Sequence, residues 1–144
     1  MRILAVDPGE KRLGIALSDP SCTIASPLTI IRHISRQIDS ETITKLAIEK
    51  EVSLIIVGQA LDENNFATPQ SRRAERLAQA IRERIEIPVK LWDESSSTEA
   101  IHSAQIAMSV SRKKRRGYID DLAAAYILQT YLDSEIGIIP AQKL

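Results

Sequence analysis

The chain has 144 residues, of which 44% are hydrophobic and 26% are charged, and its formal net charge is zero. These are ordinary values for a globular domain, and they argue against a disordered, collagen-like or coiled-coil protein. One cysteine and two histidines exclude an internal disulfide and a Cys/His zinc cluster, so any metal ion would have oxygen ligands.

No apolar run approaches the ~20 residues that span a bilayer. A charge also interrupts the N-terminal apolar stretch too early for a signal peptide. We therefore expect a cytoplasmic protein with no membrane partner. The zero net charge hides an uneven distribution, because Arg112–Arg116 is a run of five basic residues. Without that run, 14 basic residues stand against 19 acidic ones, so an acidic body carries one concentrated basic segment.

Three strands are predicted in the first part of the chain. Ile3–Val6 is a short apolar stretch that ends in a turn, where Gly9 can supply a positive φ. Leu13–Leu17 is close enough to pair back on it as a hairpin. Thr23–Ile31 contains Pro27, which predicts an edge strand or a bulge.

Helices and strands alternate after residue 39. The periodicities predict a helix at Asp39–Glu51, a strand at Ser53–Val57, a loop at Asp62–Pro69, a helix at Gln70–Glu86, a strand at Pro88–Trp92, a helix from the capping box Ser96–Glu99 to about Met108, a basic loop at Ser109–Tyr118 and a helix at Ile119–Leu132. Leu54–Val57 is apolar on both faces, which is typical of a strand inside a sheet that helices cover on both sides. We expect a mixed α/β sheet in a single domain, residues 1–135, followed by a tail, residues 136–144.

Carboxylates occupy three unusual positions. Asp7 and the pair Asp93-Glu94 each follow a predicted strand, and the carboxyl ends of strands are where open α/β sheets bind ligands. Asp120 opens an almost wholly apolar helix, where it shares one helical line with Ala124, Ile127 and Tyr131. Each position has a structural alternative, which is turn chemistry for Asp7 and helix capping or the helix dipole for the others.

Together these acids indicate an oxygen-liganded metal site. Clustered carboxylates repel one another unless a cation lies among them, and Mg²⁺ or Mn²⁺ suits such ligands. Two such ions ~3.5–4 Å apart can clamp the attacking and leaving oxygens of a phosphodiester displacement. Neither His33 nor His102 has a partner pattern, so we expect no chemistry from either.

Basic side chains near these acids could hold a polyanion. The candidates are Lys11, Arg12, Arg72, Arg73, Arg76, Arg112, Lys113, Lys114, Arg115 and Arg116. Solvated, mobile segments are the alternative for such charges. Aromatic residues make up only 3% of the chain, so we expect recognition of backbone and shape, not base stacking.

The motifs, taken together, resemble the YqgF/RuvX family of small bacterial proteins, described as Holliday junction resolvase-like and linked to pre-16S rRNA cleavage. The resemblance runs from about residue 2 to 133 and keeps the order and spacing of its segments. The matching segments are Ile3–Gly9 with Lys11–Ala16, Pro27-Leu28, Ile55–Gly58, Asp93-Glu94 with Ser97-Thr98 and Ala100, and Ile119-Asp120 with Ala123-Ala124 and Ile127-Leu128. It implies an RNase H-like α/β fold, with a central mixed five-stranded sheet flanked by helices.

The resemblance also implies a metal-dependent nuclease that uses Mg²⁺ or Mn²⁺. Its catalytic and metal-binding residues map to Asp7, Glu94 and Asp120, with Asp93 as a further candidate ligand. The implied activity is 5′-end processing of pre-16S rRNA in ribosome biogenesis, by a monomer or homodimer acting on structured RNA. A Holliday junction resolvase-like endonuclease acting on branched DNA is the alternative.

Two departures keep a non-catalytic nucleic-acid-binding module open. The family usually has an arginine after the Asp-Glu pair, where this chain has Ser95. After Leu54–Val57 the family tends to read Gly-Leu-Pro and later an Asp-Gly turn, where this chain has Gly58–Leu61 and Asn64-Asn65. A phosphate loop of the Gly-x-x-x-x-Gly-Lys-Ser/Thr type is absent from the sequence, which argues against a nucleotide-handling enzyme.

Overall fold

A computed structural model of the chain describes residues 1–93 and 112–137, and within the second range the side chains of residues 122–135. The predicted helix that begins at Ser96–Glu99 lies outside these residues, as do Glu94 and most of the predicted tail. None of the helices in the described ranges has the length and hydropathy that crossing a bilayer requires.

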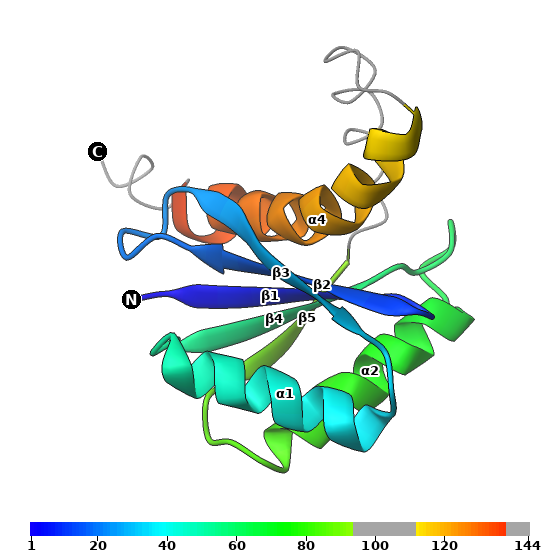
Figure 1. Cartoon of the computed structure of the whole chain (residues 1–144), viewed down its shortest axis with the longest axis horizontal. Coiled ribbons are helices and arrows are strands. Elements are labelled where there is room, and N and C mark those ends of the chain that lie inside the picture. The colour runs from blue at the N-terminus through cyan, green and yellow to red at the C-terminus, as the bar shows by residue number, and fades with distance from the viewer. Residues whose placement is uncertain (94–111, 138–144) are drawn as a thin grey trace.

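The described residues form a five-stranded sheet with helices on both sides (Figure 1). The elements are β1 Ile3–Pro8, β2 Arg12–Ser18, β3 Ala25–Arg32, α1 Arg36–Glu49, β4 Leu54–Gln59, α2 Pro69–Arg82, β5 Val89–Asp93, α4 Arg112–Tyr131 and a π-helical segment, η1, Leu132–Gly137.

The sheet is mixed, as the element order predicts. Its strand order is β3-β2-β1-β4-β5. β2 pairs antiparallel with β1 and with β3, whereas β4 pairs parallel with β1 and with β5. Pro27 lies in the edge strand β3, and the pairing of β2 with β3 shifts register between Ile15 and Ala16. Both consequences expected from this proline are therefore present.

Alternation along β1 divides the core into two clusters. Leu4 and Val6 pack in the cluster beneath α1 and α2, whereas Ile3 and Ala5 pack in the cluster beneath α4. All four residues are fully buried. β4 alternates in the same way, which confirms that it is covered on both faces. Figure 1 shows the resulting layers, with α1 and α2 on one side of the sheet and α4 on the other.

Two helices differ in extent from their predicted ranges. α1 begins three residues before Asp39, because the Ser35 side chain caps it by accepting a hydrogen bond from Ile38 N. α2 ends at Arg82, four residues before the predicted end at Glu86. The Arg82 guanidinium there donates to Val89 O in β5, so the chain has already turned toward the next strand.

The prediction of a basic loop at Ser109–Tyr118 is wrong for its described part, because the chain is helical from Arg112 onward. Arginine and lysine are strong helix formers, and this intrinsic preference outweighs the repulsion expected among five consecutive like charges. Asp120 consequently lies eight residues inside α4 and does not open it. The helix-cap alternative for Asp120 is therefore excluded.

Candidate active site at the carboxyl end of strand β1

Asp7 lies near the carboxyl end of β1, on the face of the sheet that α4 covers. It pairs with Gly14 of β2 and is half-buried. Ile3 and Ala5 contribute to the α4-side cluster, and side chains two residues apart on a strand share a face. The Asp7 carboxylate therefore continues the α4-facing row of β1 at the point where the buried core ends.

The turn after Asp7 depends on the absence of a side chain at Gly9. Gly9 N donates a hydrogen bond of 3.0 Å to Arg12 O. A Cβ atom at this glycine would lie only 2.4 Å from the same carbonyl oxygen. The φ angle of Gly9 is not positive, so the expected use of a positive φ is wrong. Glycine is required here because two backbone segments approach each other closely, and not because the backbone adopts a left-handed conformation.

Asp93 ends β5, but the strand's alternation places it on the other face from Asp7. Trp92 faces α4, because its Nε1 donates to Thr130 Oγ1 at 3.1 Å and its ring meets the edge of Tyr131 at 5.2 Å. Leu91 packs against the cluster beneath α1 and α2, so Asp93 follows Leu91 to that side. The structure does not bring Asp7 and Asp93 together on one face. Glu94 lies outside the described residues.

The backbone of Asp120 lies on the α4 side, toward the same end of the sheet as Asp7. Ala25 N donates to Gln129 Oε1 and Gln129 Nε2 donates to Thr23 O, each at 3.0 Å, which ties the far end of α4 to the start of β3. Nine residues of helix cover about 14 Å from Gln129 back to Asp120. Along β3, the five residues from Ala25 to the position level with Asp7 cover about 17 Å. Asp120 and Asp7 therefore lie at similar distances from the contact between Gln129 and Ala25. Figure 1 shows α4 running along β1 and β2 in this direction.

Three residues of α4 are predicted to share one helical line with position 120. Ala124, Ile127 and Tyr131, which share that line, are all buried in the α4-side cluster, as the sequence pattern predicts. Among the residues whose side chains the structure describes, 1–93 and 122–135, no three acidic, histidine or cysteine side chains form a metal-sized group. Of the four predicted ligands, Asp7 and the helix position of Asp120 share a face and an end of the sheet. Their carboxylate chemistry suits Mg²⁺ or Mn²⁺.

The predicted basic residues fall into three places. Lys11 and Arg12 are exposed at the turn between β1 and β2. Arg72 and Arg76 are exposed on α2, and Arg73 Nη1 lies 3.8 Å from Glu10 Oε1. Arg112–Arg116 are the first five residues of α4. The arginines of α2 thus belong to the face opposite α4.

Sequence reasoning missed a histidine–aspartate pair at this same end. His33 Nδ1 lies 2.5 Å from Asp39 Oδ2, so the expectation that His33 has no partner is wrong. Asp39 is buried, and its Oδ1 also accepts from Ile34 N. The sequence feature that could have indicated this pair is Ser35 as a helix cap. An acid in the first helical turn, four residues after the cap, can reach back to the chain before the helix.

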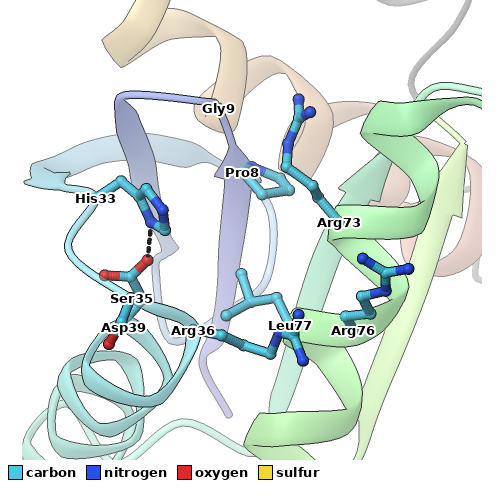
Figure 2. A pocket seen from close by; sticks show the side chains of 9 residues that line it. All are labelled: Pro8, Gly9, His33, Ser35, Arg36, Asp39, Arg73, Arg76 and Leu77. Atoms are coloured by element: carbon cyan, nitrogen blue, oxygen red, sulfur yellow. Dashed lines mark hydrogen bonds and ion pairs between the residues drawn. The ribbon is translucent and has the colours of Figure 1, made fainter.

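The His33–Asp39 pair lines a hollow of about 250 Å³ between α1, α2 and the end of β1 (Figure 2). Pro8 and Leu77 supply apolar wall, whereas three arginines, Arg36, Arg73 and Arg76, supply positive charge. Because Pro8 follows Asp7 on the strand, this hollow and the Asp7 carboxylate lie on opposite faces of the same sheet end.

Comparison with known proteins identifies the chain's relatives. The family model described as RuvX, Holliday junction resolvase, matches residues 1–134. A protein of Thermoanaerobacter pseudethanolicus is 42% identical over 136 residues, which cover 94% of this chain and 98% of that protein. A protein of Clostridium botulinum strain Hall is 40% identical over 134 residues, which cover 93% and 98%. Both are named "Putative pre-16S rRNA nuclease".

Solved structures share the architecture. RuvC of T. thermophilus, determined in complex with Holliday junction substrate, superposes with a TM-score of 0.55 at 13% identity, covering 94% of this chain and 96% of that one. The fowlpox virus Holliday junction resolvase gives a TM-score of 0.56 at 16% identity, covering 93% and 99%. These matches confirm the RNase H-like fold. On the family model and the curated relatives, this chain is a member of the RuvX family of nucleases.

Proposed function

We propose that this protein is a divalent-metal-dependent nuclease that hydrolyses phosphodiester bonds in structured nucleic acid, with pre-16S rRNA as its substrate. The observation that carries the proposal is the position of Asp7, at the carboxyl end of a central strand on the α4-covered face. The chain is also 40–42% identical to relatives with this name, over almost their whole length.

The proposed catalytic and metal-binding residues are Asp7, Glu94 and Asp120. Of the adjacent acids, Glu94 is preferred to Asp93, because the alternation of β5 directs Asp93 away from the Asp7 face. A bound Mg²⁺ or Mn²⁺ would supply an activated water and stabilise negative charge on the departing oxygen. The carboxylates' own role is to hold positive charge at the place where the phosphodiester must lie.

Cleavage of branched DNA is the second candidate, since the family model carries the description Holliday junction resolvase. The fold similarity to RuvC supports the architecture alone, because identity there is only 13%. Two labelled substrates, a pre-16S rRNA precursor fragment and a four-way DNA junction, separate the two candidates when each is incubated with Mg²⁺, Mn²⁺ or EDTA.

The decisive variant is Asp7→Asn, which keeps the size of the side chain and removes its charge. We expect the cleavage rate to fall roughly a hundredfold or more, the scale for losing one electrostatic group of a catalytic site. The matched control is Asp133→Asn, because Asp133 is exposed beyond α4 and only accepts a hydrogen bond from Gln129, which asparagine can also do. Equal cleavage by Asp7→Asn and the control would overturn the proposal.

A further inference from the structure

The hollow between α1 and α2 has an excess of positive charge. Arg36, Arg73 and Arg76 line it, together with a single carboxylate, Asp39. Among the described residues, neither Arg36 nor Arg76 takes part in an ion pair. Figure 2 shows Arg36 reaching from α1 below Leu77, with Arg73 and Arg76 on α2. Guanidinium groups at a concave site are the usual means of binding phosphate.

Arg73 has a donor that no described residue satisfies. Its Nε is buried and has no hydrogen-bond partner in the described part of the protein, while Nη1 makes only the 3.8 Å contact with exposed Glu10. A buried donor without a partner destabilises the fold. Arg73 thus brings to the hollow a positive charge that the exposed Glu10 carboxylate, 3.8 Å away, only weakly offsets.

Asp39 offsets only one of the three guanidinium charges, and neighbouring groups occupy both of its oxygens. Oδ2 contacts His33 Nδ1 and Oδ1 accepts from Ile34 N. The pair fixes the His33 ring at the wall of the hollow and leaves Nε2 without a partner among the described residues. The His33 ring is therefore held at a place where a phosphate bound in the hollow would change its surroundings.

A second, wider hollow of about 680 Å³ adjoins the first, and His33 lines both. Lys11, Arg12 and Arg32 line the second hollow together with one acid, Glu10. Arg12 and Arg32 are direct cross-strand partners, and like charges in that position destabilise a sheet. Leu13 and Ile31 pack beneath α1 and α2, so their neighbours Arg12 and Arg32 lie on the α4 side, and the two hollows meet at the end of the sheet, at His33.

We propose that the first hollow, on the sheet face opposite Asp7, binds a phosphate group of a nucleic-acid backbone that passes around this end of the sheet through the second hollow. The proposal rests on the proposed function and adds an anchoring site to it. At about 250 Å³ the hollow is smaller than the pockets of roughly 300–1,000 Å³ that hold small-molecule ligands. Its size suits one phosphate, and its continuation into the second hollow suits a chain of phosphates.

The test is binding of a fluorescein-labelled pre-16S rRNA hairpin at several salt concentrations, measured by anisotropy. In the variant Arg36→Gln/Arg76→Gln we expect roughly tenfold weaker binding, and a salt slope smaller by about 1. The matched control Lys45→Gln/Lys50→Gln removes the same charge from α1 and its C-cap, outside both hollows. Equal losses in the two double variants would overturn the proposal, because they would reflect net charge alone.

A second readout does not depend on RNA cleavage. Inorganic phosphate should shift the His33 ring signals in NMR spectra of the wild-type protein, and the shift should be lost in Arg36→Gln/Arg76→Gln. An unchanged His33 signal, or the same shift in the variant, would contradict the phosphate site. If wild type binds RNA through this site but cleaves nothing, the anchoring site stands and the proposed nuclease function fails. If wild type cleaves RNA and the double variant binds as wild type does, only the anchoring site fails.

Discussion

The two faces of the sheet differ most at the end where β1 stops. On the face under α4, the strand's row of apolar side chains ends in a carboxylate, Asp7. On the face under α1 and α2, the next residue, Pro8, lines a hollow rich in arginine. One strand thus contributes an acid to one side and a wall of a cationic hollow to the other, because successive side chains alternate.

This difference teaches how the fold can separate chemistry from anchoring. A cluster of carboxylates repels a phosphate backbone unless cations lie among them, whereas guanidinium groups attract it without any metal ion. Because Asp7 and the first hollow lie on opposite faces, Arg36, Arg73 and Arg76 do not neutralise Asp7 directly. Substitutions on the two faces should therefore affect different steps.

The largest structural effect is expected from the core, where both faces should matter equally. Ile43 of α1 and Ile127 of α4 are each almost fully buried, in the two different clusters. We expect Ile43→Ala and Ile127→Ala each to lower the free energy of unfolding by about 3 kcal/mol. Urea denaturation followed by circular dichroism would measure both. A cost below about 1 kcal/mol for either variant would show that its face is not a packed core.

A smaller effect is expected at Gly9 in the β1–β2 turn, which directly follows Asp7 and Pro8, the two residues that face opposite sides of the sheet. In Gly9→Ala the new Cβ would collide with Arg12 O, which is backbone and cannot rotate away. We expect a loss of about 2 kcal/mol in unfolding free energy, together with weaker RNA binding and slower cleavage, because Asp7 and Pro8 both precede the turn. Thermal unfolding and the two assays measure this. Unchanged stability in Gly9→Ala would contradict the close approach.

The smallest effect is expected at the opposite end of the sheet, in the turn between β2 and β3. The pKa of Asp19 is lowered to about 2 by the backbone N–H of Ile24, the Ser21 hydroxyl and the backbone N–H of Thr23. A lowered pKa in the folded protein means that the ionised form stabilises the turn. That stabilisation is complete above about pH 4 and is lost as the pH falls toward 2.

Amide exchange of Thr23 and Ile24 between pH 2 and 5 would measure the effect of Asp19. We expect their protection to fall with acid in wild type and to be low throughout in Asp19→Asn. The same acid response in wild type and Asp19→Asn would assign the loosening to another group. Because this turn is remote from Asp7 and Pro8, Asp19→Asn should leave RNA binding at neutral pH unchanged.

Much of the fold was predictable because burial leaves a simple pattern in the chain. A strand that is apolar on both faces, such as Leu54–Val57, predicts helices on both sides of the sheet, and Pro27 predicts the edge position of its strand. The start of α4 was not predictable from charge, because helix propensity and repulsion oppose each other in Arg112–Arg116 and only the fold shows which is larger.

The candidate site was only partly predictable, since side-chain direction depends on register. Asp93 and Asp7 look equivalent as residues that follow strands, but pairing of β4 with β5 places them on different faces. The contact of His33 with Asp39 needs a cap that turns the chain back on itself, and residue spacing alone does not contain that geometry. The arginines of α2 were identified, whereas the hollow they share with Arg36 required the packing of two helices.

The most direct test of the separation of the two faces is single-turnover cleavage of the rRNA fragment, measured over a range of protein concentrations. Asp7→Asn should lower the limiting rate roughly a hundredfold and leave the half-saturating protein concentration unchanged. Arg36→Gln/Arg76→Gln should raise the half-saturating concentration roughly tenfold and leave the limiting rate within about twofold of wild type. A result in which both variants change the same parameter would contradict the assignment of chemistry to one face and anchoring to the other.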